Sequence, residues 1–372
     1  MILLNSSIGN YVLSNGKKSS YFGGNNYLGL ASHPAVKEAS IKAIEKYGVN
    51  FSASRRTSGT ADIHLELERK LSDFKGTQDT VVFASGYLGN SILLEVLRDR
   101  YSAIYMDQNA HPSINTAIHG DCRAVYRYKH CDPQDLENLL SMNSHLSPLI
   151  ITDGIFALTG EIAPLERIYS IAKKYKALII VDDAHSTGVL GQTGKGTPEY
   201  FNLPDDRNIF QSETMSKALG SYGGFISGQK NLTNLIRERS SIYQASTSLP
   251  PPVVAAGISS LGIMGENPGL RDCVLKKAGW IREAIISLGF NTSQDKTPII
   301  PVIFPDMSNA NSLSSFLEEN GVIVPCMNYP SAQGLHMIRI AVTATHTDDQ
   351  ANELIDLLKK WKIKINPAQH EL

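Results

Sequence analysis

The sequence has little cysteine, no long hydrophobic run and no excess of charge of either sign. Its four cysteines, Cys122, Cys131, Cys273 and Cys326, show no Cys-x-x-Cys spacing, so neither a metal site nor a disulfide framework is indicated. No apolar stretch approaches the roughly 20 residues of a membrane helix, and the first five residues are too short and uncharged for a secretory signal. Lys and Arg number 35 against 36 Asp and Glu, which argues against a nucleic-acid partner. We therefore expect a cytoplasmic protein with reduced thiols and no membrane span.

Short apolar runs alternate with amphipathic stretches through the middle of the 372 residues. The runs lie at residues 80–83, 103–106, 148–152, 177–181, 208–210 and 224–227, and the helical patterns lie at 61–74, 87–97, 133–141 and 164–175. The runs are continuously apolar, as in strands covered on both faces. This order predicts an α/β fold whose central sheet is mostly parallel, with helices on both faces and ligands at the carboxyl ends of the strands.

Punctuation residues predict three parts of the chain. Residues 1–30 are expected to form an N-terminal arm with a hairpin at Asn15-Gly16, a strong turn signal. Residues 31–250 are expected to form a large domain. A Leu-Pro-Pro-Pro break at residues 249–252 then opens a helical stretch that continues to Leu288 and begins a smaller α+β domain over 251–372.

Lys217 is the most informative residue. It lies in Ser-Glu-Thr-Met-Ser-Lys-Ala-Leu-Gly-Ser-Tyr-Gly-Gly at 212–224, just after an apolar run. Small and hydroxyl-bearing neighbours are a poor setting for a solvated ammonium. They suit an amine held against a flat, phosphorylated ligand, and a lysine with a lowered pKa can form a Schiff base with an aldehyde.

Asp182 and His185 follow the apolar run 177–181, at the expected carboxyl end of a strand. A carboxylate there could hold a protonated ring nitrogen, and the histidine could donate to a ring oxygen. The alternative is a hydrogen-bonded Asp–His pair with a purely structural role in a loop. Asp182 and His185 alone do not decide between the two, and the presence of Lys217 further along the chain favours the ligand site.

Three further positions carry weaker signals. The turn Ser85-Gly86-Tyr87 could cradle phosphate at a helix start, although such turns are common. His111 could stack on a cofactor ring or be structural. Arg339, flanked by apolar residues, needs a carboxylate partner that is either a substrate or an internal acid, and the sequence favours neither.

From Asn25 to about His346 the chain resembles the α-oxoamine synthases, a family of fold-type I enzymes that use pyridoxal 5'-phosphate (PLP). Matching stretches follow the family's order: Asn-Asn-Tyr-Leu-Gly-Leu at 25–30, Ser-Gly-Tyr at 85–87, residues 107–113, Thr-Asp-Gly-Ile-Phe at 152–156, residues 181–188 and residues 214–224. The resemblance implies a homodimer with shared active sites. It also implies decarboxylative condensation of an amino acid with an acyl-CoA or acyl-carrier-protein thioester.

The resemblance also implies roles for individual residues. Lys217 would carry PLP as a Schiff base and serve as the base, Asp182 would pair with the pyridine nitrogen, His185 with the phenolic oxygen, and His111 would stack on the ring. The phosphate would be surrounded by Gly86, Tyr87 and Thr214, together with Thr247 and Ser248 from the neighbouring subunit. Arg339 would hold the amino-acid carboxylate, with help from Asn25.

Within the family, residues 181–201 and Thr-Pro-Ile-Ile-Pro-Val at 297–302 look most like the branch of 8-amino-7-oxononanoate synthases, which join L-alanine to a pimeloyl thioester in biotin synthesis. The short N-terminal arm departs from that branch. Met-Asn-Tyr-Pro-Ser at 327–331 is closer to glycine C-acetyltransferase or serine palmitoyltransferase. Ala157 and Thr159 replace a usual Ser and Asp, which predicts the loss of one hydrogen bond near the cofactor oxygen.

Two other classes of function compete with this one. A catalytically idle PLP-binding module would fit the replacements at Ala157 and Thr159. A nucleotide-binding oxidoreductase would share the sheet, but the chain lacks Gly-x-Gly-x-x-Gly after its first strand.

Overall fold

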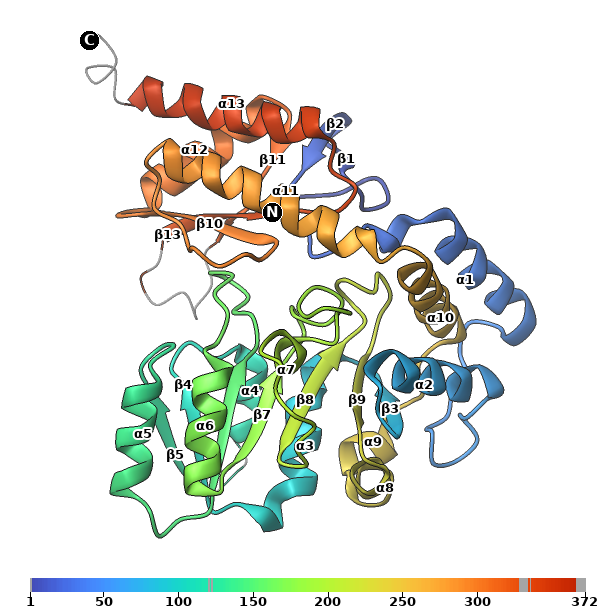
Figure 1. Ribbon diagram of the computed structural model, residues 1–372. Coiled ribbons are helices and arrows are strands. Elements are labelled where there is room, and N and C mark those ends of the chain that lie inside the picture. Colours follow the sequence, from blue (N-terminus) through green and yellow to red (C-terminus); the bar gives the residue numbers. More distant parts are fainter. Residues whose placement is uncertain (1, 120, 122, 328–333, 335, 366–372) are drawn as a thin grey trace. The chain divides into compact units, whose positions relative to one another are not determined.

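A computed structural model describes residues 2–119, 121, 123–327, 334 and 336–365 (Figure 1). The chain forms two compact units. The large unit contains residues 33–156 and 162–267, and the small unit contains residues 1–32, 157–161 and 268–372. The three-part division expected from the sequence stays a prediction.

The large unit is built on a seven-stranded sheet with the strand order β3-β9-β8-β7-β6-β4-β5. Its strands are β3 (Asp79–Phe83), β4 (Ala103–Asp107), β5 (Ala124–Tyr128), β6 (Pro148–Asp153), β7 (Leu178–Asp182), β8 (Ile209–Thr214) and β9 (Gly224–Gly228). The five strands from β4 to β8 are parallel, and β9 runs antiparallel to both β3 and β8. The mostly parallel sheet predicted from the apolar runs is confirmed.

Helices cover both faces of this sheet because successive side chains of a strand point to opposite faces. Ile104 and Met106 of β4 belong to one apolar cluster, together with side chains of α3 (Gly89–Leu97), α4 (Pro112–Ile118), α8 (Lys230–Arg239) and α9 (Ser241–Ala245). Tyr105, between them, belongs to a second cluster with side chains of α5 (Pro133–Met142) and α6 (Leu165–Tyr175). The strand residues are buried in both clusters, which explains the continuous apolar runs in the sequence.

The helices of the large unit are α1 (Pro34–Tyr47), α2 (Asp62–Lys75), α3 (Gly89–Leu97), α4 (Pro112–Ile118), α5 (Pro133–Met142), α6 (Leu165–Tyr175), α7 (Thr197–Tyr200), α8 (Lys230–Arg239), α9 (Ser241–Ala245) and α10 (Pro251–Glu266). A short 3-10 turn, η2 (Gly86–Leu88), leads into α3. The predicted helical stretch up to Leu288 is confirmed in extent, but it consists of two helices, because α10 ends before Pro268 and a separate helix, α11 (Gly269–Ser287), begins after it.

The small unit contains two three-stranded sheets, ordered β1-β2-β11 and β10-β13-β12. Its strands are β1 (Tyr11–Ser14), β2 (Lys17–Tyr21), β10 (Ile299–Phe304), β11 (Val322–Ile323), β12 (Cys326–Met327) and β13 (His336–Ala341), and its helices are α11 (Gly269–Ser287), α12 (Met307–Glu319) and α13 (Asp348–Ile365). The predicted hairpin is confirmed. Asn15 and Gly16 have φ of 50° and 77°, as a tight hairpin turn requires.

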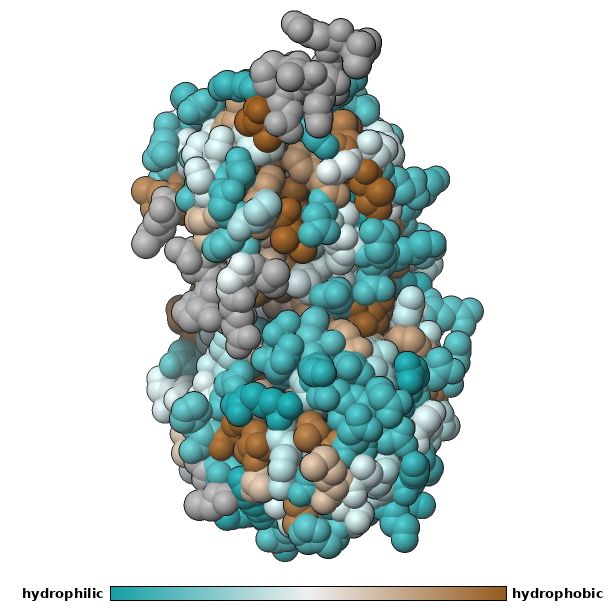
Figure 2. Space-filling view, turned by 90° about the vertical axis from the view of Figure 1, so that its left-hand side faces the viewer, coloured by the Kyte–Doolittle hydropathy of each residue, from teal (hydrophilic) through white to brown (hydrophobic). Residues whose placement is uncertain are grey.

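On the face shown in Figure 2, hydrophobic residues form separate small patches among hydrophilic ones. Among the described residues, no helix combines the length and the apolar character needed to cross a membrane.

Candidate active site

Asp182 is the last residue of β7 and is buried, with 6% of its surface exposed. Its Oδ2 accepts a hydrogen bond of 2.7 Å from the side-chain amide of Asn90 and one of 3.4 Å from the hydroxyl of Ser113. Its Oδ1 accepts from the backbone N–H of Ala184 at 3.1 Å. These donors hold a carboxylate in place at the carboxyl end of a central strand.

His111 precedes α4 and caps it, because its Nδ1 accepts from the backbone N–H of Ser113 at 3.2 Å. Burial lowers the pKa of His111; the charge of Asp182 opposes this, and the charge of Lys217 adds to it. The ring is therefore neutral at physiological pH. Its edge-on neighbour is Tyr87, at 6.2 Å between ring centroids.

Asp153, the last residue of β6, lies close to His111 and Asp182. Its Oδ2 accepts from the backbone N–H of His111 at 3.0 Å. Burial raises the pKa of Asp153 well above its usual range, and the adjacent Asp182 raises it further, whereas Lys217 lowers it. Asp153 and Asp182, at the carboxyl ends of neighbouring strands, thus have different hydrogen-bond donors. The positive charge of Lys217 acts on this end of the sheet.

Lys217 lies in the loop that follows β8 (Ile209–Thr214) and is half-buried. Thr214, at the end of β8, holds the loop: its hydroxyl donates to the backbone oxygen of Gly223 at 3.0 Å and accepts from the backbone N–H of Ser216 at 3.1 Å. The structure therefore brings Lys217, His111 and Asp182 to the same end of the sheet, as their positions after strands predict.

The predicted phosphate turn lies beside Thr214. A Cβ on Gly86 would lie only 2.6 Å from the Cβ of Thr214, and one on Gly224 would lie 2.8 Å from the backbone nitrogen of Gly86. These glycines allow three backbone segments to approach closely. Ser85 caps the turn by accepting from the N–H of Tyr87 at 3.3 Å. The turn leads into α3, which has nine residues, and the free backbone N–H groups at the start of a helix can bind an anion such as phosphate.

The other predicted residues of the large unit lie in two places. His185 is buried in the loop after Asp182. Thr247 forms an isolated β-bridge with Ser54, and the adjacent Ser248 donates its backbone N–H to Ala53 at 3.0 Å. The buried hydroxyl of Ser248 has no hydrogen-bond partner among the described residues.

The small unit contains the predicted substrate arginine. Arg339 of β13 is 4% exposed, and its guanidinium donates to the backbone oxygen of Ala157 at 2.6 Å, to the Oδ1 of Asn25 at 2.9 Å and to the hydroxyl of Tyr27 at 3.4 Å. All three acceptors are neutral. Among the described residues, no carboxylate pairs with this buried cation, so the internal partner that the sequence left open is absent from that part of the chain.

Sequence reasoning missed three residues that shape the site: Asn90, Ser113 and Asp153. Asn90 is fully buried in the apolar helix α3, and this polar residue at a core position was the available signal. Asp153 and Ser113 fall inside recognised motifs, but nothing in the sequence indicates which charges they meet.

The sequence departs from the family pattern at Ala157, at Thr159 and in the segment 327–331. Ala157 contributes a backbone oxygen to Arg339, a contact that any residue could make. Thr159 is buried, and its hydroxyl has no partner among the described residues. Of the segment 327–331, only Met327 lies within the described residues.

The family model for aminotransferase class I and II matches residues 20–358. A putative 8-amino-7-oxononanoate synthase of Acetivibrio thermocellus is 37% identical over 345 residues, which cover 92% of this chain and 89% of that protein. An 8-amino-7-oxononanoate synthase of Thermoanaerobacter pseudethanolicus is 37% identical and covers 98% of this chain and 93% of its own length.

Solved structures with the same fold include a serine palmitoyltransferase of Sphingomonas wittichii, with a TM-score of 0.92, 27% identity and coverage of 98% of this chain and 92% of that chain. A serine palmitoyltransferase from S. paucimobilis, solved with a bound PLP–myriocin aldimine, has the same values. An 8-amino-7-oxononanoate synthase of Francisella tularensis has a TM-score of 0.79 at 24% identity, covers 94% of this chain and 99% of its own, and supports the fold alone.

The residues of the large unit fit PLP. A buried, triply hydrogen-bonded carboxylate suits a protonated ring nitrogen, a neutral imidazole suits a flat ring, and the glycine-lined turn suits a phosphate. The chain belongs to the aminotransferase class I and II family, as a PLP-dependent enzyme related over nearly its whole length to the 8-amino-7-oxononanoate synthases.

Proposed function

We propose that the protein condenses L-alanine with a pimeloyl thioester, carried by CoA or by an acyl carrier protein, and releases carbon dioxide and the thiol to give 8-amino-7-oxononanoate. The relatives named 8-amino-7-oxononanoate synthase, at 36–39% identity over at least 90% of this chain, support this choice of substrates.

The structural observation that best supports an amino acid as a substrate is the environment of Arg339. A buried guanidinium is costly unless an anion or good acceptors compensate for its lost hydration. Here the acceptors are an amide oxygen, a phenol and a backbone oxygen. The planar fork of an arginine suits the two oxygens of an α-carboxylate, which would supply the missing charge.

The residues of the large unit would perform the chemistry. When bound, PLP supplies an electron sink for the negative charge that develops on the α-carbon. Asp182, held by Asn90 and Ser113, would keep the ring nitrogen protonated, and His111, whose pKa burial lowers, would pack against the ring without adding a second positive charge. The amine of Lys217 is the base that removes and returns the α-proton.

A serine palmitoyltransferase-like activity is the second candidate, since the TM-score to serine palmitoyltransferases is 0.92 against 0.79 for the Francisella enzyme. Backbone similarity reflects the shared scaffold, whereas substrate choice resides in side chains. The identity of about 37% to 8-amino-7-oxononanoate synthases, against 27% to the palmitoyltransferases, therefore favours the pimeloyl substrate. Glycine C-acetyltransferase activity is the remaining member of this set.

We also propose that the protein is a cytoplasmic homodimer in which each active site contains residues of both subunits. The buried Ser248 hydroxyl, which lacks a partner among the described residues, is available for a phosphate bound by the second subunit. Exposed apolar side chains on α1, Ile41 and Ile44, would then be covered.

The test is a thiol-release screen of alanine, glycine and serine against acetyl-, pimeloyl- and palmitoyl-CoA and pimeloyl-acyl carrier protein. We expect turnover with alanine and a pimeloyl donor. Turnover only with glycine and acetyl-CoA, or only with serine and palmitoyl-CoA, would replace the substrate assignment. A yellow protein that releases no thiol with any pair would indicate an idle PLP-binding module.

A further inference from the structure

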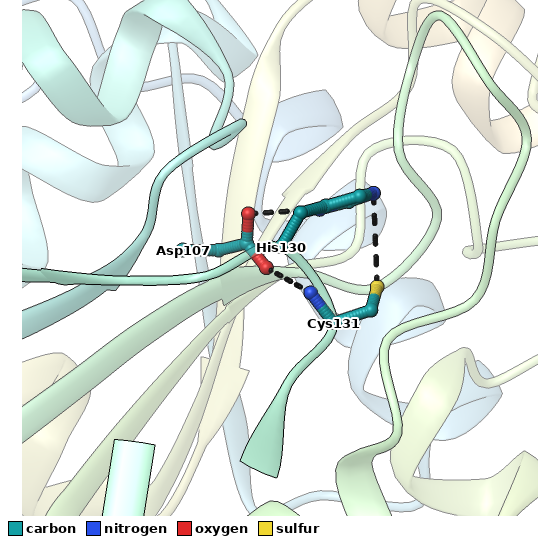
Figure 3. Close-up of side chains that lie close together, drawn as sticks. All are labelled: Asp107, His130 and Cys131. Carbon is teal, nitrogen blue, oxygen red and sulfur yellow. Dashed lines mark hydrogen bonds and ion pairs between the residues drawn. The ribbon is translucent and has the colours of Figure 1, made fainter. Parts of the chain in front are cut away.

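Three side chains outside the proposed PLP contacts form a relay at the ends of β4 and β5: Asp107, His130 and Cys131 (Figure 3). The Oδ1 of Asp107 lies 2.9 Å from the Nδ1 of His130, and the Nε2 of His130 lies 3.8 Å from the Sγ of Cys131. The carboxylate, imidazole and thiol are therefore arranged in sequence, with one ring nitrogen facing each neighbour.

The relay is held in a fixed orientation. Asp107 is 1% exposed; besides His130, it accepts backbone N–H groups from Asn109 at 2.8 Å and from Cys131 at 2.8 Å. The ring of His130 also packs edge-on against Phe156, with centroids 4.3 Å apart. A carboxylate can only accept, so Nδ1 of His130 carries the proton toward Asp107. In the neutral ring, Nε2 is then left as an acceptor for the thiol proton.

The backbone of Cys131 is unusual. Its φ is 50°, in the left-handed region that favours glycine and asparagine over other residues. This conformation accompanies the contact between the sulfur and the ring of the preceding residue, while the Cys131 N–H is bonded to Asp107. Backbone strain of this kind is often retained where it positions a reactive group.

We propose that Cys131 is a redox-sensitive thiol, activated by His130 and Asp107, whose oxidant is a hydroperoxide. His130 accepts the thiol proton, and the sulfur attacks one oxygen of the hydroperoxide. The O–O bond breaks, the proton moves from His130 to the leaving oxygen, and an alcohol or water departs. Sulfur is oxidised by two electrons to a sulfenic acid, and the peroxide is reduced by the same two. This inference concerns a site that the condensation reaction does not use.

A bound metal ion is the other chemistry that these residue types allow. Both oxygens of Asp107 are already engaged by N–H donors, which leaves one nitrogen and one sulfur as direct ligands. Structural zinc sites ordinarily use four protein ligands and catalytic ones three. The arrangement therefore favours a carboxylate–imidazole–thiol relay over a metal centre.

Two other cysteines are internal controls. The thiol of Cys273 donates to the backbone oxygen of Ala344, and burial raises the pKa of Cys326, whose sulfur lies 3.6 Å from that of Met307. Within the part of the chain that the structure describes, neither has a histidine or a carboxylate as its hydrogen-bond partner. Both should react as ordinary or protected thiols.

The experiment treats the PLP-loaded protein at neutral pH with limiting hydrogen peroxide, traps sulfenic acid with dimedone and identifies the labelled peptides by mass spectrometry. Cys131 should be labelled about tenfold faster than Cys273 or Cys326, because the thiolate is the reactive form. His130→Gln and Asp107→Asn should each reduce the Cys131 rate several-fold and leave the Cys273 rate unchanged. Cys131→Asn, which suits the left-handed backbone, should abolish this label and retain the PLP absorbance, and so reports on folding.

Equal labelling of Cys131 and Cys273 would overturn the proposal. So would a Cys131 rate that is unchanged in a folded His130→Gln or Asp107→Asn variant. Preincubation with zinc chloride alone tests for a metal site. If micromolar zinc protects Cys131 from oxidation and labelling, and a chelator reverses this protection, the cluster binds metal instead. None of these outcomes depends on turnover of amino acid or thioester, so failure here and failure of the proposed condensation are distinguishable.

Discussion

Asn90 donates a hydrogen bond of 2.7 Å from its side-chain amide to the Oδ2 of Asp182, across the interface between α3 and the end of β7. This bond holds in place the carboxylate that, in the proposed function, would pair with the ring nitrogen of the cofactor. Ser113 donates to the same oxygen over a longer distance, 3.4 Å.

The bond predicts that Asn90→Leu weakens PLP binding. The substitution keeps the approximate volume but removes a hydrogen bond to a charged group, worth about 1.5–3 kcal/mol. We expect the dissociation constant of PLP, measured by absorbance titration, to rise about tenfold or more. Asn138→Ala, on the exposed side of α5, is the control and should bind PLP normally. Unchanged affinity in Asn90→Leu would mean that Asp182 does not depend on this support.

Lys217→Ala should remove the covalent bond to the cofactor. After borohydride reduction, mass spectrometry should find the PLP adduct on the parent protein and none on the variant, and condensation should fall below detection. Lys230→Ala, at the exposed start of α8, should retain both. A PLP adduct of unchanged yield in the Lys217→Ala protein would assign the anchor to another lysine.

Arg339→Ala should raise the KM for the amino acid. Loss of a charged hydrogen-bonding pair costs about 1.5–3 kcal/mol, or roughly ten- to a hundredfold in KM. The KM for the acyl donor should change little. Tyr27→Phe removes the 3.4 Å contact to Arg339 and the 3.3 Å bond from the Tyr27 hydroxyl to Oδ1 of Asn25, keeps the guanidinium, and should have a smaller effect. An unchanged amino-acid KM in Arg339→Ala would place the carboxylate elsewhere.

His346 predicts a loss of stability in mild acid. Its ring stacks on Phe22 with centroids 3.9 Å apart; Nδ1 accepts from the N–H of Thr343 at 2.9 Å, and Nε2 lies 3.0 Å from the oxygen of Tyr21. Burial lowers the pKa of His346 to about 4. Because the unfolded chain binds a proton near its ordinary pKa of about 6.5 and the folded chain does not, the contribution is complete above that value and is lost as the pH falls toward 4.

The free energy of unfolding should therefore fall by about 2 kcal/mol between roughly pH 7.5 and pH 5 through this group. Urea unfolding followed at both pH values measures the change. His346→Gln should be less stable at the higher pH but should lose this part of the pH dependence. A variant with the same pH dependence as the parent protein would assign the acid sensitivity to other groups.

The strand ends were accessible to sequence reasoning because their signal is local. An apolar run followed at once by Asp182, or by the loop of His111, predicts a polar residue at the carboxyl edge of a parallel sheet. The same logic located the hairpin at Asn15-Gly16, where the turn itself selects the residues.

Other features depend on contacts between distant residues. The strand β5 (Ala124–Tyr128) was missed because it lies at the sheet edge, where Ala124 and Arg127 are exposed and no continuous apolar run is required. The pairing of Asn90 with Asp182, 92 residues apart, depends on how α3 packs on the sheet. The left-handed backbone of Cys131 likewise accompanies a bond to Asp107, 24 residues away, which no local pattern indicates.

The central claim is tested most directly by identifying the products formed from L-alanine and pimeloyl-CoA by the PLP-loaded protein. The account predicts 8-amino-7-oxononanoate, carbon dioxide and free CoA in equal amounts, detected by mass spectrometry and thiol titration, and none of them with Lys217→Ala. CoA release without the amino ketone, or an amino ketone formed equally well by Lys217→Ala, would contradict it.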